Sequence, residues 1–207
     1  MASVDEVVAL KNLPVVDQPV PVMAPPFLIN MQTDECLAQM PAIVMYLADK
    51  HDYLPEDAYR KSLVLKVLLD SNDLLSDLTN ANGSKMWEHE QWGIFRSERL
   101  VRWMQMFEQT GIQFGLESDS GFLLGGSRAT CADIAVTALF GTMTRCLKPL
   151  SQDLAANAPR IAALVARMES HSVIQRFFVD QEAVYENLYC GGQIEKSIRK
   201  MLAKDEK

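Results

Sequence analysis

Residues 39–42, Gln-Met-Pro-Ala, could bind an anion, because they open a predicted helix. A proline suits the first helical turn, where a missing N–H group costs no hydrogen bond, and Pro41 fits that place. The free N–H groups of a first turn and the helix dipole together attract carboxylate or phosphate groups. The alternative is a buried amphipathic helix that binds nothing. From these residues alone, both interpretations stand.

Three tryptophans, Trp87, Trp92 and Trp103, could line a pocket for an apolar substrate, since such pockets are rich in aromatic side chains. Trp103 and Phe107 lie four residues apart in a predicted helix, which favours the core for both. Trp87 comes just before that helix. We therefore predict that Trp87 is the substrate-binding residue.

Three aspartates, Asp70, Asp73 and Asp77, lie at helical spacing on another predicted helix. Acidic residues in such a row usually form a solvated face, and we expect this for at least two of the three.

The composition argues against several classes of function. A net charge of −7 and a pI near 5.0 disfavour a nucleic-acid surface, which needs clustered cations. There is no apolar run of transmembrane length, and the N-terminus lacks the basic start and long apolar core of a secretory signal. The cysteines are scattered without a C-x-x-C pair, and the three histidines form no metal pattern. We expect reduced thiols, no metal and a cytoplasmic protein; the cysteines are Cys36, Cys131, Cys146 and Cys190.

The first quarter of the chain must supply the elements that position residues 39–42. A short helix is predicted over Ser3 to Lys11, because Ser3 and Glu6 have the spacing of a capping box. Residues 12–26 contain five prolines and are expected to be extended or turning. A β-hairpin is predicted next, with one strand over Phe27 to Met31 and the other over Glu35 to Ala38.

The pattern of residues from Leu37 to Pro55 predicts the end of a strand, a tight turn and an amphipathic helix. Four residues of this helix are expected to face a core: Ile43, Val44, Tyr46 and Leu47.

From Glu56 onward the pattern is helical. One long helix is expected over Lys61 to Asn80 and a second over Glu88 to Gln109, followed by a glycine-rich loop from Gly111 to Gly126. The apolar face of the first comprises Leu63, Val67, Leu68, Leu74, Leu75 and Leu78.

A third helix begins near residue 130. Thr130 and Asp133 have the spacing of an N-cap and the third helical residue, so each can satisfy the backbone N–H of the other. Further helices are expected after Ala158-Pro159 and at Ser172. The tail after Gly191-Gly192 predicts an amphipathic helix with Ile194, Ile198 and Met201 on one face.

Two motifs carry a resemblance to a known family. The pattern Q-x-x-A-I-x-x-Y-L-A at residues 39–48, followed by Tyr-Leu-Pro, resembles the third helix of the glutathione-transferase family. Thr-x-x-Asp-Ile-Ala at residues 130–135, behind the loop GFLLGG, resembles the cap of that family's central C-terminal helix. The resemblance spans roughly residues 24 to 180.

The resemblance implies a mainly helical α+β fold: a partial thioredoxin-like β-β-α unit over residues 1–54 and an all-helical domain over residues 55–207. It implies that Gln39, Met40 and the start of their helix hold the γ-glutamyl carboxylate of glutathione. Pro25 or Pro26 would be the family's cis-proline, whose neighbour binds the glutathione cysteine. Asp73 would reach the glutathione amine across a homodimer.

The chain also departs from the family. The family's N-terminal domain runs β-α-β-α-β-β-α, and its catalytic Tyr, Ser or Cys lies in the first part. For that part we expect no matching residues in this chain beyond the helix at Ser3. Met40 replaces the serine that binds the carboxylate, a loss of about 1.5–3 kcal/mol for a hydrogen bond to a charged group. If Pro26 is the cis residue, Pro25 has no N–H to donate; if Pro25 is, Ala24 supplies that donor.

No residue is assigned as catalytic. Ser3 is better explained as a cap, Tyr46 as a core residue with its hydroxyl at the rim, and Cys36 as a buried strand thiol. We expect a dimeric glutathione-transferase-like protein that conjugates a small electrophile weakly or not at all. A non-catalytic interaction module and a truncated gene product are the alternatives.

Overall fold

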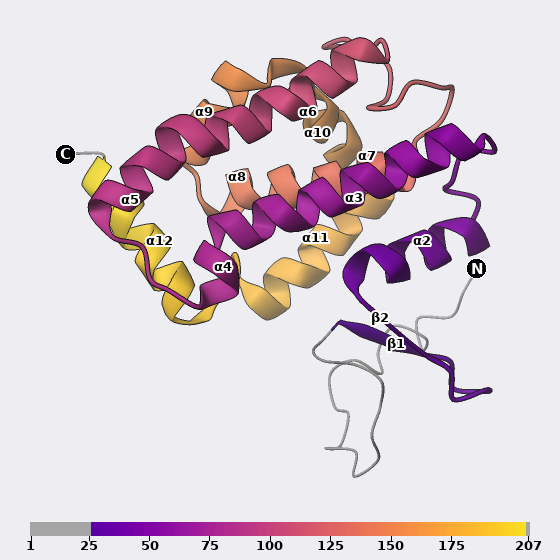
Figure 1. Cartoon of the computed structure of the whole chain (residues 1–207), viewed down its shortest axis with the longest axis horizontal. Helices are drawn as coiled ribbons and strands as arrows, with labels where there is room; N and C mark the ends of the chain where they lie inside the picture. Colours follow the sequence, from indigo (N-terminus) through magenta and orange to yellow (C-terminus); the bar gives the residue numbers. More distant parts are fainter. Residues whose placement is uncertain (1–25, 206–207) are drawn as a thin grey trace. The chain divides into compact units, whose positions relative to one another are not determined.

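Residues 26–205 are described by the structure, a computed structural model drawn in Figure 1. Contacts divide the chain into two units, Met1–Leu54 and Pro55–Lys207, and each is treated separately. The helix expected at Ser3–Lys11, the prolines before Pro26 and Pro25 itself lie outside the described residues.

The first unit contains a short hairpin. Strands β1 (Phe27–Ile29) and β2 (Cys36–Ala38) pair antiparallel, with Phe27 opposite Ala38 and Ile29 opposite Cys36. Both strands are shorter than their predicted ranges, because Asn30 already belongs to the turn: its carbonyl accepts the Asp34 N–H at 2.8 Å, and its side chain accepts the Gln32 N–H at 3.0 Å. The hairpin itself is confirmed.

Helix α2 (Met40–Lys50) follows the hairpin and has Pro41 in its first turn, as predicted. Its buried residues are Pro41 and Ala48, while Tyr46 and Leu47 are 47% and 37% exposed. The prediction that Tyr46 and Leu47 face a core is therefore wrong. Residues seven apart share a helix face, so Pro41 and Ala48 define the buried side, and Tyr46 projects away from it.

The second unit begins with α3 (Ala58–Leu78), which the side chain of Asp57 caps at Arg60 N. Its buried apolar face contains Val64, Val67, Leu68, Leu74 and Leu78. The predicted face is correct except at its edges: Leu63 is only half-buried and Leu75 is 39% exposed.

The second long helix extends from His89 to Gln113 in three segments, α5 (His89–Ile94), the π-helical turn η2 (Phe95–Leu100) and α6 (Val101–Gln113). It ends four residues later than expected, because Gly111 lies inside α6 and not in the loop. A Cβ atom at Gly111 would lie 2.6 Å from Leu116 Cδ2, so the absent side chain makes room for the incoming loop.

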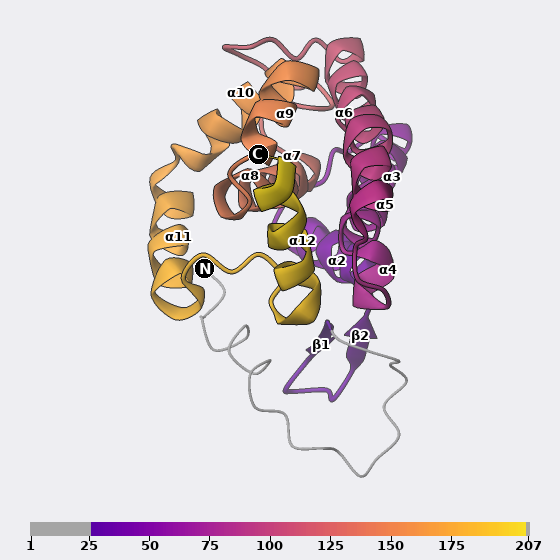
Figure 2. The same cartoon turned by 90° about the vertical axis from the view of Figure 1, so that its left-hand side faces the viewer.

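The centre of the helical unit is the buried helix formed by α7 (Cys131–Val136), η3 (Thr137–Gly141) and α8 (Thr142–Cys146). It packs against α3 and against α10 (Pro159–Glu169), as Figures 1 and 2 show. Fully buried side chains along it include Val136, Phe140 and Met143.

The remaining elements are α4 (Asn80–Gly83), α9 (Leu150–Asn157), α11 (Ser172–Tyr185) and α12 (Gly192–Asp205). Ile198 and Met201 of α12 are buried and Ile194 is half-buried, which confirms the amphipathic tail. Across residues 26–205, no helix has the length and apolarity to cross a membrane.

Candidate functional site

The start of α2 is held by a strained residue. Gln39 has φ 72° and ψ 118°, a conformation that residues other than glycine rarely adopt, and its side chain does not cap the helix. The Gln39 carbonyl accepts the Ile43 N–H at 3.0 Å, and Pro41 has no N–H. The first turn therefore offers the N–H groups of Met40 and Ala42 to an anion. Strained backbone of this kind collects at ligand sites, where surrounding structure maintains it.

No hydroxyl or thiol side chain lies at this helix start within residues 26–54. Thr33 is in the hairpin turn, where it donates to Glu35 at 2.8 Å, and Cys36 is half-buried in β2. Tyr46 and Tyr53 are exposed. Met40 itself is half-buried, and its thioether is a very weak acceptor and no donor. Pro26 is exposed just before β1.

The three aspartates of α3 have different surroundings. Asp70 forms an ion pair with Lys66, and Asp77 accepts from Arg99 at 2.5 Å and from the Trp103 indole at 2.8 Å. Asp73 is exposed and has no hydrogen-bond or ion-pair partner within the described part of the chain. Of the three, Asp73 is the one whose carboxylate is available to a ligand.

Trp87 lines an open pocket of about 430 Å³ in the helical unit. Its indole donates to the Leu78 carbonyl at 3.0 Å and packs 4.9 Å from the ring of Phe95. Trp92, whose ring centroid lies 5.4 Å from that of Trp87, is fully buried. Trp103 is half-buried on α6, and neither Trp92 nor Trp103 lines the pocket. The lining residues are Ser76, Asp77, Asn80, Ala81, Trp87, Gln91, Ile94, Phe95 and Arg99.

One wall of this pocket is a turn at which the sequence predicts the end of the helix, at Asn82-Gly83, but not the left-handed conformation of the whole segment. Asn80, Ala81, Asn82 and Gly83 all have positive φ, from 48° to 77°, so α4 is a left-handed turn. Asparagine and glycine tolerate this region best, so the sequence Asn-Ala-Asn-Gly was the available signal.

Asp133 is fully buried and holds the start of the central helix. Its carboxylate accepts from Thr130 N at 2.8 Å, from Thr130 Oγ1 at 3.0 Å and from Leu123 N at 2.7 Å. The Thr130 side chain in turn accepts the N–H of Asp133, which completes a capping box. Burial raises the pKa of the Asp133 carboxyl, while the bonds from Thr130 and Leu123 oppose that change. This group supports the fold and contacts no pocket.

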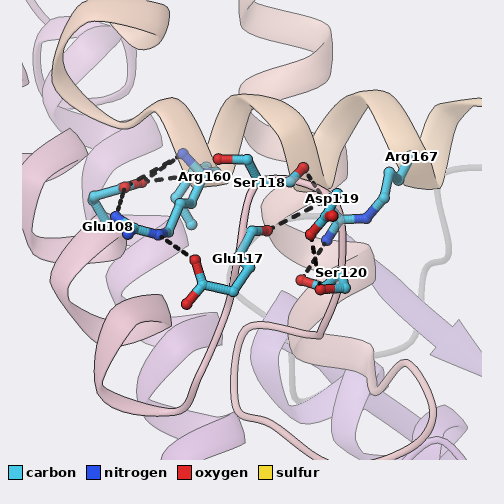
Figure 3. A network of polar contacts seen from close by, with 8 residues as sticks. Glu108, Glu117, Ser118, Asp119, Ser120, Arg160 and Arg167 are labelled. Carbon is cyan, nitrogen blue, oxygen red and sulfur yellow. Dashed lines mark hydrogen bonds and ion pairs between the residues drawn. The ribbon is translucent and has the colours of Figure 1, made fainter.

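A second buried carboxylate, which the sequence analysis did not single out, is Glu108 on α6 (Figure 3). It accepts the N–H groups of Arg160 and Ile161 at 3.0 Å and 3.1 Å, so it caps the start of α10 from another helix. The Arg160 guanidinium pairs with it at 3.3 Å.

The loop after α6 is fastened by Arg167 of α10 (Figure 3). Its guanidinium donates to four carbonyl groups, at distances from 2.7 to 3.4 Å, which belong to Glu117, Ser118, Ser120 and Gly121. The network in Figure 3 is thus a fold-supporting one, with every acidic group already engaged.

The thiols of the helical unit do not have the environment of reactive cysteines. All four cysteines are free. Burial raises the pKa of Cys131 to about 11, and it also raises the pKa of Cys146. Cys190 is exposed as a residue, but partial desolvation of its thiol and the nearby Glu195 carboxylate raise its pKa to about 11. A protonated thiol is a poor nucleophile and a poor metal ligand. Among the described residues, no group of three or more His, Cys, Asp or Glu side chains could hold a metal ion.

Comparisons with known proteins identify the family. The family model described as "Glutathione S-transferase, C-terminal domain" matches residues 63–201, more than half of the chain. The structure of an Onchocerca volvulus Pi-class glutathione S-transferase aligns with a TM-score of 0.63 and 17% identity, over 77% of this chain and 71% of that one. The structure of NaGST-2 aligns with a TM-score of 0.53 and 19% identity, over 70% and 68%. A comparison with curated proteins gives no match. The mainly helical fold and the matched domain agree, and the chain belongs to the glutathione S-transferase family.

Proposed function

We propose that this protein binds glutathione at the start of α2, with the N–H groups of Met40 and Ala42 and the side chain of Gln39 as ligands of the γ-glutamyl carboxylate. The observation that carries the proposal is the strained, uncapped Gln39 immediately before a first turn with two free donors. A structural helix gains nothing from such a conformation, which costs of order 1–3 kcal/mol. A bound carboxylate would satisfy the donors and interact with the helix dipole.

The affinity is low in this proposal, because Met40 contributes no hydroxyl to the carboxylate. Pro25 and Pro26 are proposed to border the cysteine part of glutathione. Residues 1–54 would form the glutathione-binding domain and residues 55–207 the helical domain. The catalytic residue stays unassigned.

Conjugation to a small electrophile is proposed to be slow. The thiolate of glutathione is the nucleophile, and it needs a positioned donor to stabilise it. Removing one such preorganised donor commonly costs about 10²–10³ in rate. No hydroxyl or thiol of residues 26–54 lies at the start of α2 to serve in this way. Trp87 is our candidate for contact with an apolar electrophile, since its half-buried ring lines the open pocket.

The family assembles as dimers in general, and we propose a homodimer for this chain as well. Two exposed leucines of α3, Leu65 and Leu69, lie one turn apart on one side of the helix and support it, because an exposed apolar patch marks an association surface. Asp73 lies four residues after Leu69 on the same helix and is proposed to reach the glutathione amine of the second subunit. We further propose a cytoplasmic location, which suits four free thiols.

The experiment is a calorimetric titration of glutathione into the wild-type chain and three variants. Met40→Ser should tighten binding about tenfold or more, since it adds a hydrogen bond to a charged group. Gln39→Ala should weaken it. Met31→Ser, at an exposed methionine of the hairpin turn, is the matched control and should leave the affinity unchanged.

A parallel assay with glutathione and an aryl halide tests the chemistry. We expect little turnover from the wild-type chain. Absence of binding in both the wild type and Met40→Ser would overturn the glutathione proposal. Turnover at the level of ordinary family members, lost on Gln39→Ala, would contradict the proposed impairment while supporting the site.

A further inference from the structure

Helix α11 has an apolar face that nothing in the described part of the chain covers. No residue of α11 is buried. Ile174 and Phe178 are half-buried and face inward, where the Arg145 guanidinium lies 3.8 Å from the Phe178 ring. On another side of the helix, Val173, Phe177 and Val184 are 66%, 56% and 57% exposed. Figure 2 shows α11 at the margin of the helical unit.

These three exposed residues form one row. At about 100° per residue, Val173, Phe177 and Val184 project within roughly 40° of one another over three turns. We name Val173, Phe177 and Val184 the α11 row. Val179 is as exposed as Val173, at 66%, but projects about 120–160° away from the members of the row. Exposure alone therefore does not define the row, and its regular spacing suits another helix.

The charges beside the row select the partner. Arg176 and Asp180 flank Phe177 on one side of the row. In an antiparallel pair of α11 helices, related by a two-fold axis midway between Phe178 and Val179, Val173 lies opposite Val184 of the second copy. Arg176 then lies within about one residue rise, 1.5 Å along the axis, of Asp180 of the second copy. Both side chains are on the same side of the interface, and the symmetry repeats the pair.

We propose that α11 is a self-association surface, whose occupant is α11 of a second copy of this chain in antiparallel orientation. A lipid or nucleic-acid surface does not fit, because Arg176 is the one cation among residues 172–185, against Asp180 and Glu182. The interface is isologous, with the two rows packed against each other and both Arg176–Asp180 pairs along the same edge. It is independent of the leucines of α3 and of glutathione binding.

Sedimentation equilibrium over a wide range of protein concentration tests this surface. The measurement is made in the Leu69→Glu chain, so that association through α3 does not contribute. We expect the mass to rise from monomer towards dimer with concentration. Phe177→Asp should weaken this association at least about tenfold, as removal of a central aromatic contact does. Val179→Asp, the matched control, should change the association constant by less than about twofold.

Charge reversal tests the antiparallel register. Arg176→Asp alone should weaken association, because it faces Asp180 of the second copy, and the double variant Arg176→Asp/Asp180→Arg should restore it. Thermal melting of each variant shows whether its monomer is folded. A mass that stays monomeric at every concentration overturns the proposal. Equal association of the Leu69→Glu chain with and without Phe177→Asp also overturns it. Failure of the double variant to recover overturns the antiparallel pairing.

Discussion

The Asp133 carboxylate satisfies three donors at the start of the buried central helix, one of which, Leu123 N, comes from the preceding loop. We expect Asp133→Ala to lower the free energy of unfolding by about 1 kcal/mol or more, because loss of a helix cap costs that much and the buried donors stay unsatisfied. The midpoint of urea unfolding measures it. Glu98→Ala, at an exposed site on η2, is the control. An unchanged midpoint for Asp133→Ala would show that the cap does not support the fold.

Glu195 is also a buried carboxylate, near the start of α12. Burial would raise its pKa, but bonds from the N–H groups of Gly191 and Cys190 and from Arg199 bring the pKa below its ordinary value of 4.5. The unfolded chain therefore binds this proton more readily than the folded one. Ionised Glu195 stabilises the fold above pH 4.5, and this contribution is lost as the pH falls through the folded-state pKa.

The variant Glu195→Gln tests this dependence. It should be less stable than the wild type at neutral pH, and the difference should shrink as the pH falls below 4.5. Urea unfolding of both chains across that range is the measurement. Glu182→Gln, at an exposed site on α11, should show no such convergence. A difference between Glu195→Gln and wild type that is independent of pH would contradict the assignment.

At the scale of elements, apolar periodicity predicted the helices well because burial follows it. The buried face of α3 differs from its predicted face mainly at Leu63 and Leu75. Helix α2 was less predictable, since its buried side is set by the small residue Ala48 while the larger Tyr46 is exposed. The larger apolar surface of the tyrosine side chain had suggested that Tyr46 would be buried and Ala48 exposed. Gly111 reads as a loop residue, and only its contact with Leu116 explains why it lies in a helix.

The loop over residues 117–121 shows how one side chain can order a segment without secondary structure. Arg167 donates to four of its carbonyl groups, and all five residues of the loop are exposed. We expect Arg167→Met to raise the rate of amide hydrogen exchange in this loop, with little change in the helices, because local opening loses its main restraint. Arg102→Met, at an exposed site on α6, is the control. Equal exchange in the loop of both variants would contradict this role.

For the whole molecule, the sequence predicted a mainly helical chain with a two-stranded hairpin, and the structure agrees because both patterns are local. The candidate site was predictable only in part. The helix start at Gln39 follows from Pro41 and the apolar pattern, but nothing in a glutamine indicates a φ of 72°. The left-handed turn beside Trp87 and the capping of α10 by Glu108 depend on contacts between distant residues, which periodicity does not reveal.

Association through α3 is the prediction that concerns the molecule as a whole. Leu69 is 48% exposed, the exposed Leu65 precedes it by one turn, and Asp73 follows it by one turn. In the Phe177→Asp chain, in which association through α11 is weakened, Leu69→Glu should convert the dimer to a monomer, because a charge would be buried without a partner, and a central contact of this kind is worth at least about tenfold in affinity. Sedimentation velocity measures the mass, with Val179→Glu as the control. If Asp73 acts across the dimer, Leu69→Glu and Asp73→Ala should lower glutathione affinity to the same extent. A Phe177→Asp chain that is monomeric, or a Phe177→Asp/Leu69→Glu chain that is still dimeric, would exclude α3 as the interface. Asp73 would then have to act within its own subunit or not at all.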